Sequence, residues 1–282
     1  MAVTSSGRHA AVILVNGEMT SQLAVTDRGL AYGDGLFETM AAVGGTVRHW
    51  PRHLARLREG CVRLGLPPPE AGVLEREIET ARGTETRAII KLILTRGSGA
   101  RGYRPPADPR PTRIVSRLPW PALDAAPMRL GMCRTRLGRN PTLAGVKHLN
   151  RLEQVLGAAE LDGLGVEEAL MQDDLGQVIA GTRTNVFAIR GEAVITPDLG
   201  QCGIAGIMRG LVLEHAGACG LEVHVAPLTL TDLDTADGIF LTNAIVGLWP
   251  VAALAVAGRE RRFPPTAAFA RLRRHFAATR LA

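Results

Sequence analysis

One lysine stands where its side-chain amine could do covalent chemistry. Lys147 follows a stretch rich in glycine and proline, and the apolar residues after it recur at helical spacing: Leu149, Leu152, Val155, Leu156 and Ala159. This spacing predicts a helix that begins just after Lys147. A lysine held at such a point is partly desolvated, which lowers its pKa, and its neutral amine can form a Schiff base. The plainer interpretation is a surface lysine at the entry to a helix.

Two glycine-rich runs carry groups that could bind anions. The run TRGSGARGY, residues 95–103, contains a GxGxxG pattern, but a dinucleotide site needs a helix there, and Pro105 and Pro106 prevent one. The plainer interpretation of this run is a glycine-rich loop in which Arg101 is solvated. The run GIAGIMR, residues 203–209, precedes an apolar-patterned helix, and backbone N–H groups at a helix start bind phosphate.

Two α/β domains are expected to position these runs. We predict strands over residues 11–16, 36–43, 46–50, 87–95, 112–117, 168–172, 178–189, 193–196, 221–226, 238–242 and 251–256. We predict helices over residues 51–64, 69–82, 206–218 and 265–279. Three prolines in residues 119–127 mark a linker between an N-terminal α+β domain, residues 1–118, and a C-terminal α/β domain, residues 128–282. A cleft between domains is a common ligand site.

The composition is typical of a globular cytoplasmic protein. Apolar residues make up 46% of the chain, yet no apolar run is long enough to span a membrane and the N-terminus carries no signal core. The four cysteines form no CxxC pair, which indicates reduced thiols. No HExxH motif and no Cys/His cluster occurs, so we expect no metal site.

The charge of the chain favours a small anionic substrate over nucleic acid. The net charge is +6, but the arginines are scattered and aromatic residues are only 4% of the chain, which leaves no stacking platform for bases. The one dense basic stretch is RLRRH, residues 271–275. Binding of a polyanion by this stretch is an alternative function.

The lysine segment resembles a known enzyme family over a long ungapped run. The run RLGRNPTLAGVKHLNRLEQV, residues 136–155, is similar to the lysine segment of the aminodeoxychorismate lyase branch of the branched-chain/D-amino-acid aminotransferase family. These are fold-type-IV enzymes that use pyridoxal 5'-phosphate (PLP). The run DRGLAYGDGLFET, residues 27–39, also resembles a signature of this family. The resemblance implies a two-domain, D-amino-acid aminotransferase-like fold, a homodimer, and conversion of 4-amino-4-deoxychorismate to 4-aminobenzoate and pyruvate in folate biosynthesis.

The resemblance also implies roles for single residues. Lys147 would hold PLP and act as the catalytic base, and Arg56 in HLARL, residues 53–57, would bind the cofactor phosphate. The implied cofactor-binding positions are Arg56, Lys147, Ala180, Asn185, Ile207, Met208, Asn243 and Ala244. The implied substrate-binding positions are Phe37, Thr39, Arg101 and Tyr103, of which the last two would meet a substrate carboxylate.

One position departs from the family pattern. In VIAGTRTNVF, residues 178–187, Ala180 stands where the family usually has a glutamate that keeps the pyridine nitrogen protonated. A protonated ring is the electron sink that stabilises a carbanion. If formation of an aromatic product drives the lyase step, that sink matters less. The alternatives are a fold-type-IV aminotransferase for D-amino or branched-chain acids, and a PLP-binding protein whose catalysis Ala180 impairs.

Overall fold

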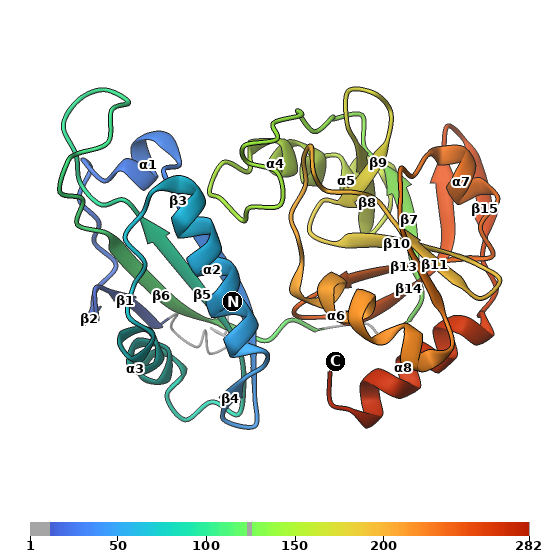
Figure 1. Ribbon diagram of the computed structural model, residues 1–282, viewed down its shortest axis with the longest axis horizontal. Coiled ribbons are helices and arrows are strands. Elements are labelled where there is room, and N and C mark those ends of the chain that lie inside the picture. Colours follow the sequence, from blue (N-terminus) through green and yellow to red (C-terminus); the bar gives the residue numbers. More distant parts are fainter. Residues whose placement is uncertain (1–11, 123–125, 282) are drawn as a thin grey trace, which may run out of the picture. The chain divides into compact units, whose positions relative to one another are not determined.

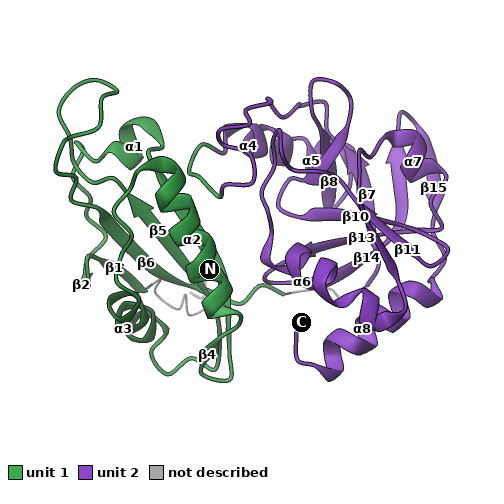
Figure 2. Ribbon diagram, viewed as in Figure 1, with its two compact units in different colours: residues 1–122, 147–150 green, residues 123–146, 151–282 purple. Residues whose placement is uncertain are grey.

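The computed structural model describes residues 12–122 and 126–281. Residue 11 of the first predicted strand and residues 123–125 of the predicted linker lie outside this range. The chain forms two compact units (Figure 2). Unit 1 comprises residues 1–122 and 147–150, and unit 2 comprises residues 123–146 and 151–282. The segment that carries Lys147 therefore belongs to unit 1, although its neighbours in sequence on both sides belong to unit 2.

Unit 1 is an antiparallel sheet with two long helices (Figure 1). Its strand order is β2-β1-β6-β5-β3-β4. The strands are β1 Val12–Val15, β2 Glu18–Met19, β3 Gly35–Val43, β4 Thr46–Val47, β5 Arg87–Thr95 and β6 Thr112–Pro119, and the helices are α1 Arg28–Tyr32, α2 Trp50–Leu64 and α3 Ala71–Arg82. Gly44 and Gly45 both have positive φ, which the tight turn between β3 and β4 requires.

The period-two pattern of β3 gives the sheet two different faces. Leu36, Glu38 and Met40 are buried, and Leu36 lies so close to Gly60 of α2 that a Cβ there would be 2.9 Å from its side chain. Phe37 and Thr39 point to the opposite face and are half-buried. That second face presents the predicted substrate-binding residues of β3.

Unit 2 is built on a nine-stranded mixed sheet. The strand order is β12-β11-β10-β13-β14-β7-β8-β9, and β15 pairs with β14. The strands are β7 Met128–Met132, β8 Glu168–Gln172, β9 Val178–Gly181, β10 Asn185–Arg190, β11 Ala193–Thr196, β12 Glu222–Val225, β13 Gly238–Asn243, β14 Gly247–Val256 and β15 Arg259–Arg262. The α-helices are α4 Leu152–Ala159, α5 Leu161–Leu164, α6 Ile207–His215, α7 Leu230–Asp234 and α8 Ala267–Ala278. Phe187 and Phe240 stack at 4.8 Å in the core beneath α6 and α8.

Several predicted elements need correction. The helix after Lys147 begins only at Leu152, because residues 147–149 are extended and bond to the start of β3. Leu152, Val155 and Leu156 are 53–70% exposed, so their helical spacing does not mark a core face within this chain. The predicted strand over residues 178–189 is two strands, separated by a turn in which Gly181 N–H donates to the Thr184 carbonyl.

Two other predicted elements were too long. The strand predicted over residues 46–50 covers only β4, because α2 already begins at Trp50. The helix predicted over residues 206–218 ends at His215 and is followed by a short 3-10 turn, Gly217–Cys219. The short elements β2, α1, β7, α5, α7 and β15 carried no recognised sequence signal.

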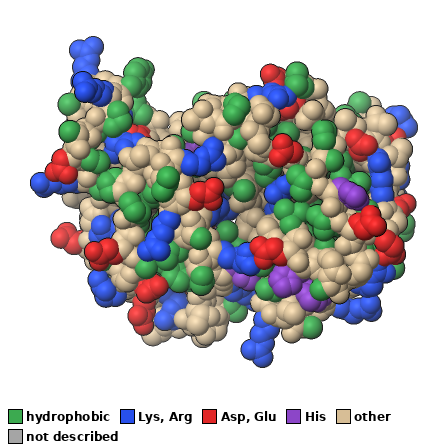
Figure 3. Space-filling model, in the orientation of Figure 1, with side chains coloured by type: hydrophobic (Ala, Val, Ile, Leu, Met, Phe, Trp, Pro, Cys, Tyr) green, Lys and Arg blue, Asp and Glu red, His purple; other side chains and the backbone are tan. Residues whose placement is uncertain are grey.

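Surface charge bears on the polyanion-binding alternative, and helix length bears on whether a helix could span a membrane. On the face drawn in Figure 3, Lys and Arg side chains alternate with Asp and Glu side chains and do not gather in one patch. In the basic run of α8, Arg271 pairs with Glu192 and donates to the Cys219 carbonyl, so it is engaged within unit 2. Within residues 12–122 and 126–281, no helix is long and apolar enough to cross a membrane.

Candidate active site

Lys147 lies against the half-buried face of the unit 1 sheet. The Phe37 N–H donates to the Lys147 carbonyl at 3.0 Å, and the Leu149 N–H donates to the Gly35 carbonyl at 3.0 Å. The Lys147 Nζ atom lies 4.1 Å from the centre of the Phe37 ring. The backbone pairing and the aromatic contact together hold the amine beside Phe37, two residues from Thr39 on the same face.

Lys91 is a second cation on this face, and the sequence reasoning missed it. The chain contains only two lysines, Lys91 and Lys147. Lys91 pairs with Thr39 across β5 and β3, and its Nζ atom lies 5.8 Å from the centre of the Phe37 ring. The available signal was a charged residue in the middle of the apolar run AIIKLIL, residues 88–94, where a fully buried strand would not tolerate it.

The start of α6 in unit 2 is shaped to receive an anion. Its N-cap residue is Gly206, which has extended backbone angles. No side chain caps the helix, so the N–H groups of Ile207 and Met208 begin it without a side-chain acceptor at the N-cap. The Asn185 side chain donates to the Ile204 carbonyl at 2.9 Å. A Cβ on Gly206 would lie 2.0 Å from the Asn185 Oδ1 atom. Any larger residue at position 206 would therefore force the Asn185 side chain or the helix start to move.

A buried hydroxyl lies beside this helix start. Thr242 pairs with Asn185 across β13 and β10, and it shares a strand face with Phe240, which packs in the core beneath α6. Thr242 is 1% exposed, and within the described residues its Oγ1 atom has no hydrogen-bond partner. Such an orphaned group needs an explanation, because leaving it unpaired costs free energy. An uncapped helix start, a glycine cradle and a spare hydroxyl fit a phosphate group. The sequence reasoning did not select Thr242, although it lies beside Asn243.

The turn after β13 is fixed by a side chain. Asn243 Oδ1 accepts hydrogen bonds from the N–H groups of Ile245 and Val246, at 2.9 and 2.8 Å. This Asx-type turn sets the backbone of Ala244, which is one of the predicted cofactor positions. Asn243 thus acts on its own turn, and its role toward a cofactor stays a prediction.

The loop that leads to Lys147 is bonded to the loop that leads to α6. The Gly145 N–H donates to the Gly203 carbonyl, and the Ala205 N–H donates to the Gly145 carbonyl, both at 3.0 Å. Gly145 has a φ of 79°, a conformation that glycine adopts easily. Lys147 follows Gly145 by two residues, and Gly206 follows Ala205 directly. These two hydrogen bonds join the two loops within unit 2.

Arg56, predicted to bind phosphate, is held by an acid in unit 1. Its Nε atom donates to Glu38 Oε1 at 2.8 Å, and its Nη2 atom donates to Glu38 Oε2. His53 Nδ1 lies 2.6 Å from Glu38 Oε2. Burial raises the pKa of Glu38, but the hydrogen bond from His53 and the charge and hydrogen bond of Arg56 outweigh it, so the pKa falls below its usual value. The predicted phosphate contact of Arg56 stays a prediction.

We expect Glu38→Gln to destabilise unit 1. Removing one partner of a buried ion pair costs about 3–5 kcal/mol, because the remaining charge stays buried. The folded pKa of Glu38 is lowered, so its contribution is present above the unfolded pKa and is lost as the pH falls through the folded pKa. Urea unfolding at pH 7 should show the loss, and the gap between parent and variant should shrink in acid. The exposed Glu59→Gln on α2, the helix that carries His53 and Arg56, is the control and should change stability by less than about 0.5 kcal/mol.

The remaining predicted residues divide between the two units. Phe37, Thr39, Arg101 and Tyr103 belong to unit 1, as Lys147 does, whereas Ala180, Asn185, Ile207, Met208, Asn243 and Ala244 belong to unit 2. Tyr103 is 84% exposed in the loop between β5 and β6. Among the predicted substrate-binding residues, Phe37 contacts Lys147.

Ala180 lies in an apolar environment. It is 8% exposed on β9, pairs with Met171 of β8, and belongs to a core cluster that includes Ile179. The buried carboxylate of Glu168, at the start of β8, is already engaged: its Oε1 atom accepts from the N–H and the hydroxyl of Thr182, and from its neighbour in sequence. Position 180 therefore provides no carboxylate, and the carboxylate of Glu168 is already hydrogen-bonded.

Comparison with known proteins gives consistent matches over most of the chain. The Amino-transferase class IV family matches residues 35–254. The chain is 37% identical over 254 residues to aminodeoxychorismate lyase of Vibrio harveyi, covering 89% of this chain and 94% of that protein. It is 34% identical to a putative branched-chain-amino-acid aminotransferase of Methanocaldococcus jannaschii, covering 85% and 86%. The solved structure of 4-amino-4-deoxychorismate lyase from Pseudomonas aeruginosa matches with a TM-score of 0.88 at 42% identity, covering 94% and 98%.

Proposed function

The chain belongs to the class IV amino-transferase family, and on that premise we propose that it is a PLP-dependent lyase acting on 4-amino-4-deoxychorismate. The products are 4-aminobenzoate and pyruvate. The fold is that of the fold-type-IV enzymes, which the match to the Pseudomonas aeruginosa lyase supports. Identity to a lyase of 37% over most of the chain favours this reaction over transamination.

One observation carries the proposal. Gly145, two residues before the only lysine in the family's lysine segment, is hydrogen-bonded to both Gly203 and Ala205 at the entry to α6. In unit 1, Lys147 carries the amine that would bind the PLP aldehyde carbon. Within unit 2, the α6 start, Asn185 and the Thr242 hydroxyl are suited to a phosphate. The spare hydroxyl and the glycine cradle support that assignment.

The residues of this chain account for the proton movements. When bound, PLP supplies an electron sink for the charge left at the substrate carbon that loses a proton. As a neutral amine, Lys147 Nζ accepts the proton from ring carbon 4 of the substrate. The bond between the ring and the enolpyruvyl oxygen then breaks, the ring becomes aromatic, and the departing group takes up a proton to become pyruvate.

Cations of unit 1 suit the two carboxylates of this substrate. Lys91 is half-buried on the sheet face that carries Phe37 and Thr39. Arg101 is exposed in the loop between β5 and β6. A lysine offers a point charge and an arginine offers a planar fork, so the pair can hold one carboxylate each. Phe37 supplies an apolar surface for the carbocyclic ring.

Ala180→Glu tests how much the reaction depends on the electron sink. We expect the lyase rate to change little, because formation of an aromatic ring drives the step, and the rate of D-alanine transamination to 2-oxoglutarate to rise. Ala180→Gln is the control for size, since an amide cannot keep the ring nitrogen protonated as a carboxylate does. Rates of 4-aminobenzoate and glutamate formation give the measurement. A large gain in lyase rate for the glutamate variant alone would contradict this account of Ala180.

The experiment that tests the function is an assay of the purified protein loaded with PLP. Formation of 4-aminobenzoate and pyruvate in equal amounts from 4-amino-4-deoxychorismate is expected. Glutamate formation from a D-amino or branched-chain amino acid with 2-oxoglutarate, without lyase turnover, would favour the aminotransferase alternative. Binding of PLP without turnover of either substrate would favour the impaired protein. The homodimer is also a proposal, which light scattering on the loaded protein tests.

A further inference from the structure

We propose that Arg28 is a positioning residue that fastens the loop carrying Arg101 and Tyr103 to α1, and so sets how tightly the substrate carboxylates are bound. The inference rests on the proposed function, because those two side chains are the ones expected to meet a substrate carboxylate. Arg28 itself is 3% exposed, so it acts through the loop.

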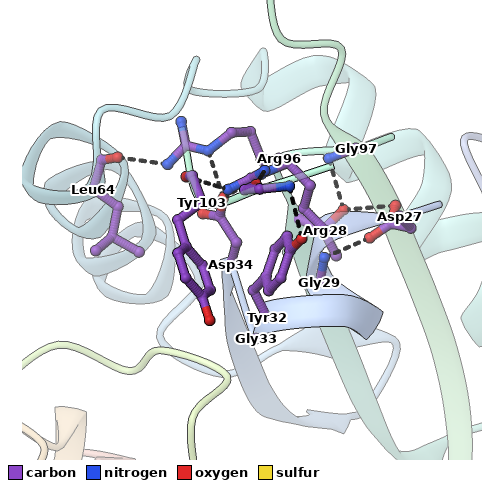
Figure 4. Close-up of polar contacts among 12 residues, drawn as sticks. Asp27, Arg28, Gly29, Tyr32, Gly33, Asp34, Leu64, Arg96, Gly97 and Tyr103 are labelled. Carbon is purple, nitrogen blue, oxygen red and sulfur yellow. Dashed lines mark hydrogen bonds and ion pairs between the residues drawn. The ribbon is translucent and has the colours of Figure 1, made fainter. Parts of the chain in front are cut away.

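Each of the three guanidinium nitrogens of Arg28 donates a hydrogen bond (Figure 4). Its Nε atom donates to Asp34 Oδ2 at 2.9 Å, its Nη1 atom to the Gly102 carbonyl at 2.9 Å, and its Nη2 atom to the Tyr103 carbonyl at 2.8 Å. The planar fork of arginine is suited to two neighbouring acceptors, and lysine cannot reproduce it. The Arg28 guanidinium thus connects the carboxylate of Asp34 to the backbone of the loop.

A second side chain of α1 holds the same loop. The Gly102 N–H donates to the Tyr32 hydroxyl at 3.3 Å, and the rings of Tyr32 and Tyr103 lie 5.3 Å apart. The Arg28 guanidinium in turn lies 4.9 Å from the Tyr32 ring centre. The N–H and C=O of Gly102 are therefore both bonded by α1 side chains. This leaves the side chain of Tyr103 directed outward, where it is 84% exposed.

Close packing of the loop against Arg28 supports the same role. A Cβ on Gly99 would lie 2.8 Å from the Arg28 Cδ atom, and a Cβ on Gly97 would lie 1.8 Å from the Arg110 carbonyl oxygen. The Arg28 N–H also donates to the Gly97 carbonyl at 2.9 Å. Gly97 and Gly99 thus let the loop pack against the Arg28 side chain and against the Arg110 carbonyl. Their use is structural, with no phosphate involved.

Arg96 offers a matched comparison within the same cluster. Its Nε atom donates to the same Asp34 Oδ2 at 2.8 Å, and its two Nη atoms donate to the carbonyls of Gly65 and Leu64 at the end of α2. Burial raises the pKa of Asp34, but the hydrogen bonds and charges of Arg96 and Arg28 outweigh it and lower the pKa, so this shared anchor is ionised at neutral pH. The two guanidinium groups make equivalent bonds, but that of Arg28 bonds to Gly102 and Tyr103, whereas that of Arg96, the first residue after β5, bonds to the end of α2.

The experiment compares Arg28→Gln, Arg28→Lys and Arg96→Gln in the PLP-loaded protein. Trypsin cleavage after Arg101 reports loop order, because Arg104 and Arg110 each precede a proline and resist cleavage. Cleavage there gives fragments of residues 1–101 and 102–282, which mass spectrometry identifies. We expect both Arg28 variants to be cut at least about tenfold faster than the parent, because the charged Arg28 guanidinium bonds to Gly102 and Tyr103, beside the cleaved bond, and such hydrogen bonds are the stronger kind. Arg96→Gln should be cut at the parent rate, because the Arg96 guanidinium bonds to the end of α2.

Kinetics separate positioning from general destabilisation. Contacts to a carboxylate act in the ground and transition states alike, so the Arg28 variants should raise KM about tenfold or more and leave kcat nearly unchanged. Arg96→Gln should leave KM unchanged even if it lowers the melting temperature. Tyr32→Phe, which removes only the bond to the Gly102 N–H, should give a smaller change in the same direction.

The outcomes are distinguishable from failure of the proposed function. Equal cleavage of Arg28→Gln and Arg96→Gln, or an active Arg28→Lys with the parent KM, overturns the positioning role. A drop in kcat with an unchanged KM also overturns it. A parent that fails to turn over 4-amino-4-deoxychorismate refutes the proposed function, while the contrast in cleavage between the two arginine variants still tests the attachment of the loop.

Discussion

Lys147→Ala is expected to abolish the lyase reaction. Loss of its acid–base role alone should lower kcat by roughly 10²–10⁴-fold, and loss of the covalent link to the cofactor adds to this. The amine cannot be replaced easily, because the backbone of residues 147–149 is bonded to Gly35 and Phe37 and fixes where the side chain starts. The same variant should lose the absorption band near about 410–420 nm that a lysine-bound PLP gives.

Because the chain contains only two lysines, one other lysine side chain could take the place of Lys147 in this test. Lys91 is the only other lysine of the chain and lies against the same phenylalanine. Lys91→Arg should keep the absorption band, although it should weaken substrate binding. Borohydride reduction of the parent followed by peptide mapping should place the cofactor on Lys147. A band that persists in Lys147→Ala and vanishes when Lys91 is also replaced would transfer the role to Lys91.

Gly206→Ala is expected to weaken cofactor binding by at least about tenfold, which corresponds to about 1.4 kcal/mol. The new Cβ would lie 2.0 Å from Asn185 Oδ1, so either the helix start or the Asn185 side chain must move. Moving Asn185 breaks its bond to the Ile204 carbonyl and disturbs the loop that is paired with Gly145. Titration of the cofactor-free protein with PLP, followed by absorbance, gives the affinity.

Two companion variants separate the phosphate site from helix stability. Gly210→Ala lies in the same helix with no atom near the new Cβ, so it should leave affinity unchanged and stabilise the protein by about 0.5–1 kcal/mol. Thr242→Val removes a hydroxyl that is orphaned in the cofactor-free protein, so it should not destabilise that form but should weaken PLP binding. If Thr242→Val destabilises the free protein and leaves PLP affinity intact, the hydroxyl belongs to the fold alone.

The sequence predicted elements well wherever a segment is long and regular. The strands over residues 87–95 and 168–172 agree with β5 and β8 at both ends, because their runs are apolar and bounded by polar turns. The helix over residues 51–64 agrees with α2 within one residue, because Pro51 begins it and Gly65 ends it. Local patterns suffice where local propensity and packing favour the same structure.

The sequence failed where long-range bonds override a local pattern. Apolar spacing after Lys147 is helical, but Gly35 and Phe37, more than a hundred residues earlier, draw residues 147–149 into an extended form. The site shows the same limit. Family resemblance pointed to Lys147 and to the α6 start, whereas Lys91 and Thr242 became visible only through strand register and an orphaned hydroxyl.

Residues 147–150 belong to unit 1 but are made after the first residues of unit 2. The Gly33 carbonyl accepts a hydrogen bond from the Asn150 side chain, and the Gly35 carbonyl accepts one from the Leu149 N–H. The Phe37 N–H donates to the Lys147 carbonyl. A ribosome has made all of the earlier part of unit 1 long before it adds these residues, so this edge stays open until synthesis passes residue 150. A fragment ending at residue 122 would contain all six strands of the sheet but would lack the segment that bonds to this edge. The first unit is therefore completed only after part of the second has been made, because residues 147–150 close its edge.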